Sequence, residues 1–329
     1  MSQPLASLSL DLDNKWSYLK THGDAGWEQY PTYLPVVIPR VLELLVERNW
    51  KITFFVVGQD AVIDGNQSAL ASLSAAGHEI GNHSFKHEPW LHLYSPDEID
   101  AEIAAAETAI QRATGRKPIG FRGPGFSFSA EVHRTLAARG YKYDASTFPT
   151  FIGPLARMYY FFTAKLTPEE RAQRKKLFGG WAEGFRPLKP YWLPEIEPPL
   201  LEIPVTTIPL IKAPLHLSYL LYLAERSPRL AKLYLEFALG MCRLAGVEPS
   251  LLLHPLDFMG SDDDGDLAFF PTMGMRSAEK VRIACELLDQ FGRQFRVVTM
   301  QEHADLAAER LGTRASSDCS TWNNLQETS

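Results

Sequence analysis

The sequence predicts an α/β protein built on a parallel sheet, and three observations support this prediction. Short apolar runs alternate along the chain with segments of helical periodicity. Strands separated by helices imply parallel pairing with right-handed crossovers. Polar residues able to carry chemistry follow several of the predicted strands, as in barrels whose active sites lie at the carboxyl ends of their strands. The strand count, about seven, is too low for a regular eight-fold barrel.

The first part of the chain shows this alternation directly. Residues 5–12 and 51–57 are apolar runs that predict strands. Between them, residues 35–49 carry apolar side chains with a helical period. Residues 67–76 predict a further helix, and Gly77 follows at a position where glycine commonly ends a helix.

The rest of the chain continues the pattern. Ser95-Pro96-Asp97-Glu98 has the sequence of a capping box with proline at the first helical position, so a long alanine-rich helix should run to about Thr114. Further strands are predicted at 119–122, 141–146, 201–207, 250–254 and 295–299. Further helices are predicted at 130–139, 228–245, 278–291 and 301–311.

Composition narrows the class of protein. The 329 residues, 45% hydrophobic and 22% charged, can bury one large core or two moderate ones. A net charge of −6 without a basic stripe argues against nucleic acid as a partner. The three cysteines, Cys242, Cys285 and Cys319, are too few and too widely spaced for a disulfide framework, which fits a reducing compartment. Residues 1–10 lack the features of a secretory signal, so we expect a cytoplasmic protein.

Two pairs of polar residues predict a metal site. Asp11 and Asp13 end the first strand and project to the same face, so one can bind a cation while the other handles a proton. His83 and His87 are four residues apart, which lets two imidazoles converge on one ion. Each pair alone is more often a solvated strand end or a structural feature. Together they favour an open, catalytic metal site.

Five short motifs follow one another from residue 8 to about residue 300, with one long interruption. They are Asp11-Leu12-Asp13, Asn82-His83-Ser84-Phe85-Lys86-His87, Gly120-Phe121-Arg122-Gly123-Pro124-Gly125-Phe126, Gly140-Tyr141-Lys142-Tyr143-Asp144-Ala145-Ser146 and Leu251-Leu252-Leu253-His254-Pro255-Leu256-Asp257-Phe258. In this order they resemble the motifs of the NodB-homology polysaccharide deacetylases, a carbohydrate esterase family that removes acyl groups from N-acylated sugars. The first motif departs from the commonest pattern, since Leu12 separates two aspartates that are usually adjacent.

The resemblance implies an irregular (β/α)7-type barrel and a role for each motif residue. Asp11 would be the general base and His254 the general acid, and Arg122 would orient Asp11. Asp144 would belong to the fourth motif. The ligands of a divalent metal, expected to be zinc, would be Asp13, His83 and His87.

General chemistry agrees with these roles. Metal-bound water has its pKa lowered toward neutrality, and a neighbouring carboxylate such as Asp11 can accept its proton. The guanidinium of Arg122 can hold a carboxylate bidentately in its ionised form. His254 can protonate the departing amine, which is otherwise a poor leaving group.

Other polar residues are interpreted as structural. We expect His78, His92, His133, His216 and His303 to be surface or packing histidines, because no motif surrounds them. The acidic run at 262–266 lacks the ligand spacing of a calcium loop and is interpreted as a solvated loop. Asp257 follows the last motif histidine and is expected at most to line the pocket or brace a neighbour.

Residues 148–199 are predicted to be an insertion between two parts of one barrel, 1–147 and 200–312. The insertion places aromatic residues next to cations, a combination that suits the membrane interface, and the apolar run at 215–223 could contact the same surface. The favoured alternative is that both segments pack on the barrel. The aromatic and basic residues of the insertion are Tyr159, Tyr160, Phe161, Phe162, Trp181, Trp192, Arg171, Arg174, Lys175 and Lys176.

Residues 313–329 are predicted to be a disordered tail.

The sequence therefore predicts a metal-dependent deacetylase or deformylase acting on an N-acylated amino sugar in a glycan, glycolipid or lipid-linked precursor. Two alternatives stay open. Asp13, His83 and His87 could form the two-histidine, one-carboxylate face of a non-haem iron oxygenase, although such an enzyme has no need of Asp11 or His254. A non-catalytic sugar-binding relative is the other alternative.

Overall fold

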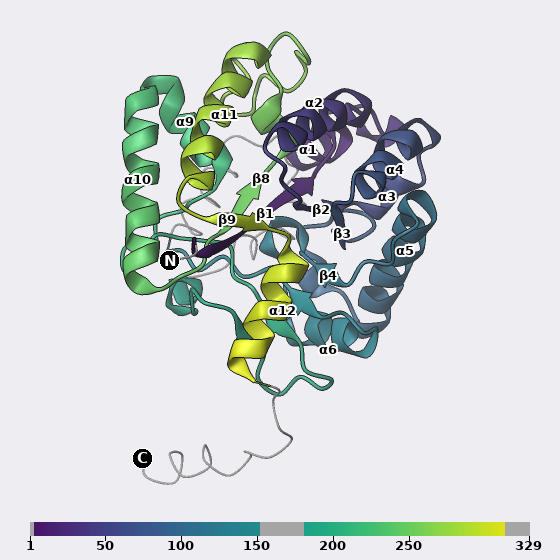
Figure 1. The fold of residues 1–329 in the computed structure, drawn as a ribbon. Coiled ribbons are helices and arrows are strands. Elements are labelled where there is room, and N and C mark those ends of the chain that lie inside the picture. The colour runs from purple at the N-terminus through teal and green to yellow at the C-terminus, as the bar shows by residue number, and fades with distance from the viewer. Residues whose placement is uncertain (1–2, 152–180, 313–329) are drawn as a thin grey trace.

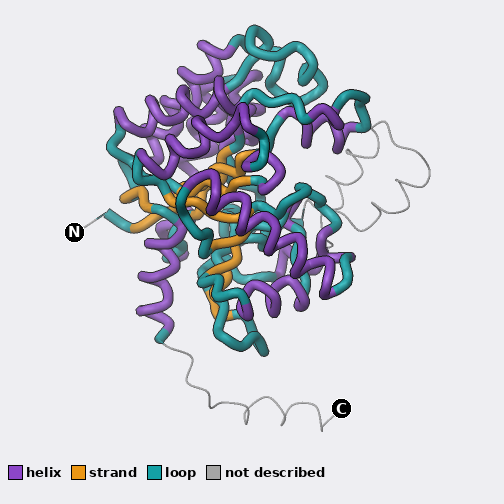
Figure 2. The backbone as a smooth tube through the Cα atoms, turned by 90° about the vertical axis from the view of Figure 1, so that its right-hand side faces the viewer, coloured by secondary structure: helices purple, strands orange, loops and turns teal. Residues whose placement is uncertain are grey.

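The computed structural model describes residues 3–151 and 181–312, and these form a sheet surrounded by helices (Figures 1 and 2). The strands are β1 (Leu5–Leu12), β2 (Thr53–Val56), β3 (Glu79–Asn82), β4 (Gly120–Phe121), β5 (Tyr143–Asp144), β6 (Tyr191–Trp192), β7 (Leu201–Glu202), β8 (Ser250–Leu253) and β9 (Arg296–Val298). The helices are α1 (Lys15–His22), α2 (Leu34–Glu47), α3 (Gly58–Ala61), α4 (Gln67–Ala75), α5 (Pro96–Thr114), α6 (Ala130–Ala138), α9 (Leu217–Arg226), α10 (Pro228–Ala245), α11 (Ser277–Gly292) and α12 (Met300–Leu311).

The strands form one sheet in the order β6-β7-β5-β4-β3-β2-β1-β8, and β9 pairs with the beginning of β1. Among the described strands, every pairing is parallel except the one between β6 and β7. The chain after β7 approaches the opposite end of the sheet, where the Thr206 N–H donates to Ser250 O at 3.2 Å. An isolated parallel bridge also joins His216 to Leu252. The sheet is thus an irregular barrel of the predicted type.

Strand β1 is buried along its whole length and has the most strand partners in the sheet. All eight of its residues are buried, and it pairs with three other strands. Leu8 and Leu10 share one apolar cluster with Phe54 of β2 and with the inner face of α2. A strand covered on both faces reads as a continuous apolar run, which is how residues 5–12 were recognised in the sequence.

The predicted helices are present, with ends within two residues of those expected. Ser95 caps α5 through the predicted capping box. The Glu98 N–H donates to the Ser95 hydroxyl, and the Ser95 N–H donates to the Glu98 carboxylate at 2.9 Å. Gly77 adopts the left-handed φ of +80° that its predicted position after a helix requires.

Two predicted surface segments have definite partners in the structure. The apolar run at 215–223 contributes to α9, whose Leu217, Leu220 and Leu221 are buried, so this segment packs on the barrel. In the acidic run at 262–266, Arg40 of α2 bonds both carboxylate oxygens of Asp263, at 2.7 and 2.9 Å. Lys15 of α1 forms ion pairs with two further carboxylates, Asp264 and Asp266. Cations therefore balance the negative charge of this loop.

Strand β6 and helix α1 were not predicted. Tyr191 and Trp192 of β6 lie in the segment assigned to the insertion, yet they pair antiparallel with β7. Apart from Trp181 and Trp192, the residues of the predicted interfacial cluster lie outside the described residues. The predicted tail at 313–329 lies outside them as well. Within the two described ranges, no helix combines the length and the apolar composition needed to cross a bilayer.

A buried carboxylate joins α3 to the start of α1. Asp60 is fully buried, and its Oδ1 accepts hydrogen bonds from Asn14 Nδ2 at 2.7 Å and Trp16 Nε1 at 2.8 Å. Its Oδ2 has no partner among the described residues. Burial raises the pKa of Asp60 to about 7, because these two hydrogen bonds compensate only part of the cost of removing the charge from water.

We expect Asp60→Asn to stabilise the metal-free protein above pH 7. Between pH 4 and 7 the folded state retains a proton that the unfolded state releases, so the stability of the wild-type protein falls as the pH rises through this window. Asparagine keeps the accepting oxygen and carries no charge. The gain should be about 1–4 kcal/mol at pH 8 and close to zero at pH 4, measured by urea unfolding. Exposed Asp64→Asn is the control, and equal urea midpoints at pH 8 for Asp60→Asn and wild type would contradict the expectation.

Candidate metal and catalytic site

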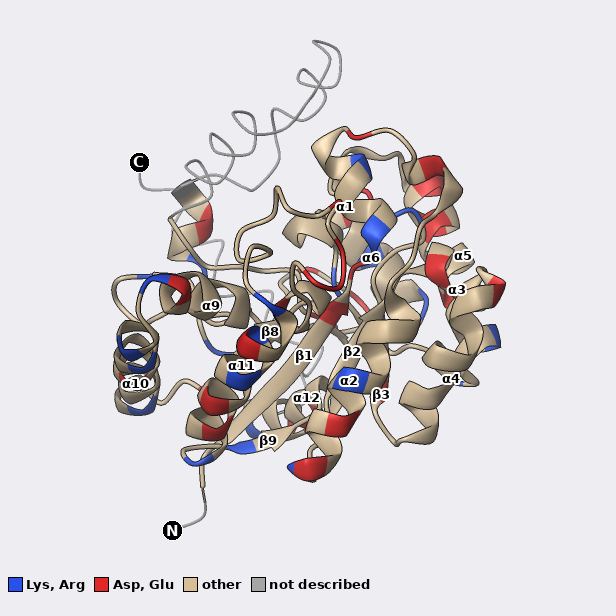
Figure 3. Cartoon of the chain, turned by 90° about the horizontal axis from the view of Figure 1, so that it is seen from above, with Lys and Arg blue, Asp and Glu red and all other residues tan. Residues whose placement is uncertain are grey.

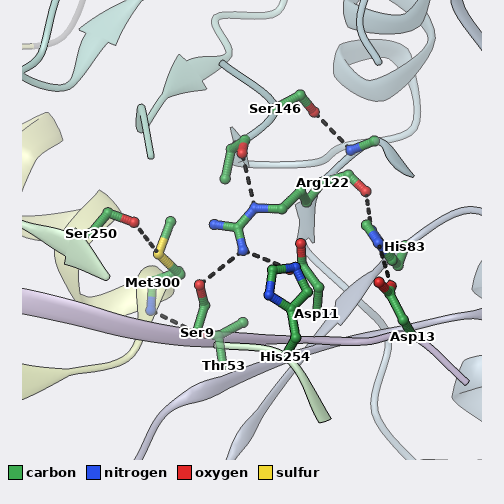
Figure 4. A network of polar contacts seen from close by, with 12 residues as sticks. Ser9, Asp11, Asp13, Thr53, His83, Arg122, Ser146, Ser250, His254 and Met300 are labelled. Atoms are coloured by element: carbon green, nitrogen blue, oxygen red, sulfur yellow. Dashed lines mark hydrogen bonds and ion pairs between the residues drawn. The ribbon is translucent and has the colours of Figure 1, made fainter. Parts of the chain in front are cut away.

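The register of the sheet brings the motif residues to one level. Strand pairing aligns Leu12, Val56, Asn82 and Phe121 across β1, β2, β3 and β4. The residues that follow three of these positions are Asp13, His83 and Arg122, which therefore leave the sheet side by side at its carboxyl edge. Figure 4 shows them together with Asp11 and His254.

Asp13, His83 and His87 form the candidate metal site. The Oδ1 atom of Asp13 lies 3.3 Å from His83 Nε2 and 2.9 Å from His87 Nε2. One donor atom from each of the three residues lies within 4.8 Å of the donor atoms of the other two. Two imidazole nitrogens and one carboxylate oxygen are a donor set that binds zinc and related divalent metals.

A tight loop, rather than a helical turn, makes the two histidines converge. Ser84 and His87 adopt left-handed φ angles of 62° and 54°. Hydrogen bonds hold this conformation: the Ser84 N–H donates to Asn82 Oδ1 at 2.8 Å, and the His87 N–H donates to Ser84 Oγ at 3.1 Å. Glu102 of α5 accepts from the two backbone N–H groups between these residues. The loop is thus fixed in advance for its ligand role.

The protonation of His83 fits metal binding. Its Nδ1 lies 2.6 Å from the carbonyl oxygen of Arg122. A carbonyl can only accept, so Nδ1 carries a proton and Nε2 is the ring atom left to bind a metal beside Asp13. Hydrogen bonds to the other ring nitrogen orient histidine ligands in metal sites in this way.

The electrostatics of the metal-free site also favour a bound cation. Burial acts to raise the pKa of Asp13, but the neighbouring His87 and His83 outweigh it and hold that pKa well below its usual range. Burial likewise acts to lower the pKa of His83, but the charges of Asp11 and Asp13 outweigh it and raise that pKa. Positive charge on His83 therefore helps to balance the carboxylates in the metal-free protein, a task that a metal would take over.

Arg122 joins Asp11 to the rest of the site. Its Nη1 donates to Asp11 Oδ1 at 2.6 Å and to Ser9 Oγ at 2.9 Å, while its Nε donates to Ala145 O at 3.0 Å. The contact with Asp11 uses one nitrogen, so the expected bidentate fork is not formed, and Nη2 has no partner among the described residues. The geometry explains this difference, because Nε is engaged by β5 and the guanidinium stacks 4.4 Å from the Phe55 ring.

Asp144 lies behind Arg122. The carboxylate is fully buried, and it accepts from Ser146 Oγ at 2.6 Å and from the Ala145 N–H at 2.9 Å. Its other oxygen lies 2.9 Å from His133 Nε2, so this histidine, expected to serve packing, is the partner of a motif residue. Asp144 thereby holds the backbone whose carbonyl oxygen binds Arg122.

A second group of possible ligands surrounds Asp144. His133, Asp144 and Glu202 have donor atoms within 4.8 Å of one another, and all three are buried. Burial, followed by the charge of Asp144, raises the pKa of Glu202 well above its usual range. A protonated Glu202 carries no charge, so it avoids a second buried negative charge beside Asp144.

His254 follows β8 beside the end of β1. The register that pairs Leu10 with Leu253 places His254 next to Asp11, as Figure 4 shows. Ser218 of α9 lies with its Oγ 3.1 Å from His254 Nδ1. Asp257 accepts from the His254 N–H at 2.8 Å and also from the hydroxyl of Ser218. Asp257 is therefore a brace, and Ser218 is a site residue that the sequence analysis missed.

Aromatic rings stand beside His254. The His216 and His254 centroids are 6.2 Å apart, and Phe148 lies 6.2 Å from His216. Phe126 packs on Phe148 at 4.8 Å. Burial, with a contribution from His254, lowers the pKa of His216 to about 3, so its ring stays neutral. These rings form an apolar wall on the His254 side of the site.

Comparison with known sequences finds similarity to deacetylases over part of the chain. The polysaccharide deacetylase family model matches residues 24–143, a stretch that contains His83, His87 and Arg122. The chain is 29% identical over 149 residues to a peptidoglycan deacetylase of Helicobacter pylori, covering 43% of this chain and 49% of the relative. It is 33% identical over 99 residues to a chitooligosaccharide deacetylase of Azorhizobium caulinodans, covering 30% of this chain and 46% of the relative. The chain thus spans about half the length of these curated relatives.

Solved structures share the fold over almost the whole chain. A polysaccharide deacetylase structure from Mycobacterium smegmatis matches with a TM-score of 0.59 and 19% identity, covering 97% of this chain and all of that one. The structure of Puue allantoinase matches with a TM-score of 0.58 and 15% identity, covering 95% and 92% of the two chains. The match over residues 24–143 and the deacetylase relatives make this part of the chain similar to the polysaccharide deacetylases, and the solved structures show the same fold.

Proposed function

We propose that this protein is a metal-dependent hydrolase that removes the acetyl group from an N-acetylated amino sugar. One observation carries the proposal: an Asp-His-His donor set lies beside a carboxylate held by a buried arginine, with a histidine next to that carboxylate on the neighbouring strand. A metal, a base and an acid within one site are what amide hydrolysis requires. An oxygenase would use the donor set but has no task for Asp11 and His254.

Asp13, His83 and His87 would hold the metal, for which zinc is the proposed identity. These residues fit a metal because their donor atoms lie close together and because the Arg122 carbonyl fixes the tautomer of His83. When bound, such a metal supplies a Lewis acid that acidifies water and polarises a carbonyl group. The positions not used by three protein ligands stay open for water and substrate.

Asp11 would accept the proton of the attacking water. Its partner Arg122 is completely buried and pairs with Asp11 at 2.6 Å, which holds the carboxylate in place. Because Arg122 engages only Oδ1, the second oxygen is left to act on the water. Ser9 shares Nη1 of Arg122 and fixes the direction in which the guanidinium points.

His254 would protonate the departing amine. The Ser218 hydroxyl has a single proton, and the carboxylate of Asp257 can only accept it. Ser218 must therefore accept from His254, which places a proton on Nδ1 of the ring. The opposite nitrogen, Nε2, is then the atom that exchanges a proton with the substrate. Ser218 acts through His254 and is a positioning residue.

The substrate class follows from the relatives and from the site. The relatives are named for peptidoglycan, chitin and chitooligosaccharide deacetylation, so an N-acetylated hexosamine is the unit proposed here. Phe148 contacts His216, the neighbour of His254, and Phe126 packs on Phe148; apolar rings of this kind offer a surface on which the apolar face of a pyranose ring can pack. Release of acetate from N-acetylglucosamine oligomers and peptidoglycan fragments is the direct assay.

Replacing His83 or His87 with alanine should abolish stoichiometric metal binding and leave the fold intact. Each change removes one of three donors and leaves a site too poor for tight binding. Metal content by mass spectrometry and thermal unfolding measure the two effects. His133→Ala, which removes a histidine from the second buried group, should keep one metal per chain. Full metal occupancy in both the His83 and the His87 variant would refute the ligand assignment.

Asp11→Asn should lower kcat about 10²–10⁴-fold, the usual contribution of a positioned general base, with metal still bound. The wild-type kcat/KM should be bell-shaped in pH, because an ionised Asp11 and a protonated His254 are needed in the same molecule. Asp305→Asn, at an exposed carboxylate on α12, is the matched control. A rate near that of the wild type would show that another group activates the water.

Ser218→Ala should lower kcat about tenfold with little change in KM, because the bound substrate does not need Ser218 but proton transfer does. Nitrogen-15 NMR of the imidazoles should show that the variant loses the preference of neutral His254 for a proton on Nδ1. Ser7→Ala removes an equivalent Ser–His bond, of 2.9 Å, to remote His303 and should leave His254 unchanged. An unaltered His254 spectrum in Ser218→Ala would remove Ser218 from the mechanism.

A further inference from the structure

The outer face of α10 carries large apolar side chains that no described residue covers. Leu230, Leu233, Phe237 and Leu244 are 49%, 68%, 52% and 85% exposed. Their spacing of three, four and seven residues places them within an arc of roughly 60° at 100° per residue. The residues that anchor the helix to the barrel, Ala231, Leu235, Ala238 and Cys242, lie on the opposite face. We call the four exposed residues the α10 stripe.

Packing on the barrel does not account for the α10 stripe. Single exposed apolar residues are common on protein surfaces, but a continuous row along one helix marks a contact surface. In Figure 1, α10 stands at the outer side of the molecule, so the stripe faces away from the barrel. Leu235 and Leu239, which are fully buried, already supply the inner contacts of the helix.

Cations lie along one border of the α10 stripe. Arg229, Lys232 and Arg243 are exposed and occupy the adjacent quarter of the helix, where Glu236 also lies. Lys232 pairs with Glu286 of α11 at 2.7 Å, and Arg226 at the end of α9 pairs with Glu225 at 3.7 Å. Figure 3 shows basic residues in blue along α10. The chain as a whole has a net charge of −6, so this basic border stands out against an acidic protein.

We propose that α10 docks on the surface of an anionic lipid bilayer, with the α10 stripe inserted at the interface and the basic border against the headgroups. A helix that is apolar on one exposed face and basic beside it is the kind of element that lies in the plane of a membrane. Anionic headgroups attract such juxtaposed cations, and the acyl boundary takes up the apolar side chains. This inference does not depend on the reaction that the barrel catalyses.

A second copy of the chain fits the same face less well. Two antiparallel α10 helices packed through their stripes would place Arg229 and Lys232 of each copy near Arg243 of the other. This antiparallel arrangement brings like charges together, which disfavours association. An anionic surface removes this repulsion, which is why the charge pattern favours lipid.

Vesicle co-sedimentation tests the proposal with the full chain. Vesicles of phosphatidylcholine alone should bind the protein weakly, and vesicles that also contain phosphatidylglycerol should bind it strongly. Binding to the mixed vesicles should weaken as salt is raised, because the headgroup attraction is screened over about 10 Å at 0.1 M ionic strength. No sedimentation with the mixed vesicles at low salt would overturn the proposal.

Two double variants assign the binding to α10. Leu233→Glu with Phe237→Glu and, separately, Arg229→Glu with Arg243→Glu should each lower the partition coefficient at least tenfold. The matched controls are Val46→Glu at an exposed position of α2 and Arg282→Glu with Arg296→Glu elsewhere on the surface. These should bind as the wild type does, and circular dichroism should show that all variants are folded.

The remaining outcomes count against the proposal. Vesicle binding that persists in both α10 variants would locate the lipid contact elsewhere in the chain. A dimer in light scattering that Leu233→Glu with Phe237→Glu converts to a monomer, without vesicle binding by the wild type, would make the stripe an interface between copies.

Discussion

The buried guanidinium of Arg122 is the interaction on which the site depends. It donates to Asp11 and Ser9 of β1 and to the carbonyl of Ala145 after β5, while its own carbonyl fixes Nδ1 of His83. The proposed base, a proposed metal ligand and three strands therefore share one residue. A buried cation is costly unless it is paired and hydrogen-bonded, so these contacts are also what allows Arg122 to stay in the core.

Parallel pairing turns this local arrangement into a catalytic geometry. Consecutive strands end at one edge of the barrel, and their register sets Asp13, His83 and Arg122 at the same level. Behind this level the polar groups are used for support: Asp144 holds the backbone that binds Arg122, and Glu102 holds the loop of the two histidines. Rigid elements of this kind position reactive groups more accurately than free loops do.

Local patterns predicted most of the fold. The apolar run of β1, the capping box of Ser95 and the glycine at residue 77 each act within a few residues, so their signals are visible in the sequence. The strand β6 is only two residues long and is defined by its pairing with β7, which no local pattern reveals. The amphipathic pattern of residues 228–245 predicted a helix, but it could not show that part of its apolar surface would face outward.

The candidate site, like the fold, was predicted only in part from the sequence. Residue spacing and the order of the motifs brought Asp13, His83 and His87 into one predicted metal site, because the signals for these residues are local. Ser218 was missed, since it contacts His254 from 36 residues away and no motif surrounds it. The single-nitrogen contact of Arg122 with Asp11 could not be foreseen either, because it depends on the competing bond to Ala145. Tertiary contacts between distant elements decide these details.

Anomalous diffraction from crystals grown with zinc, recorded on both sides of the zinc absorption edge, tests the central claim most directly. The account predicts one strong peak per chain, bonded to Asp13, His83 and His87 at about 2.0–2.2 Å, with Asp11 still held by Arg122 and not bonded to the metal. A peak instead at His133, Asp144 and Glu202, or one that takes Asp11 as a ligand in place of Asp13, would contradict the division between base and metal ligands on which the mechanism rests.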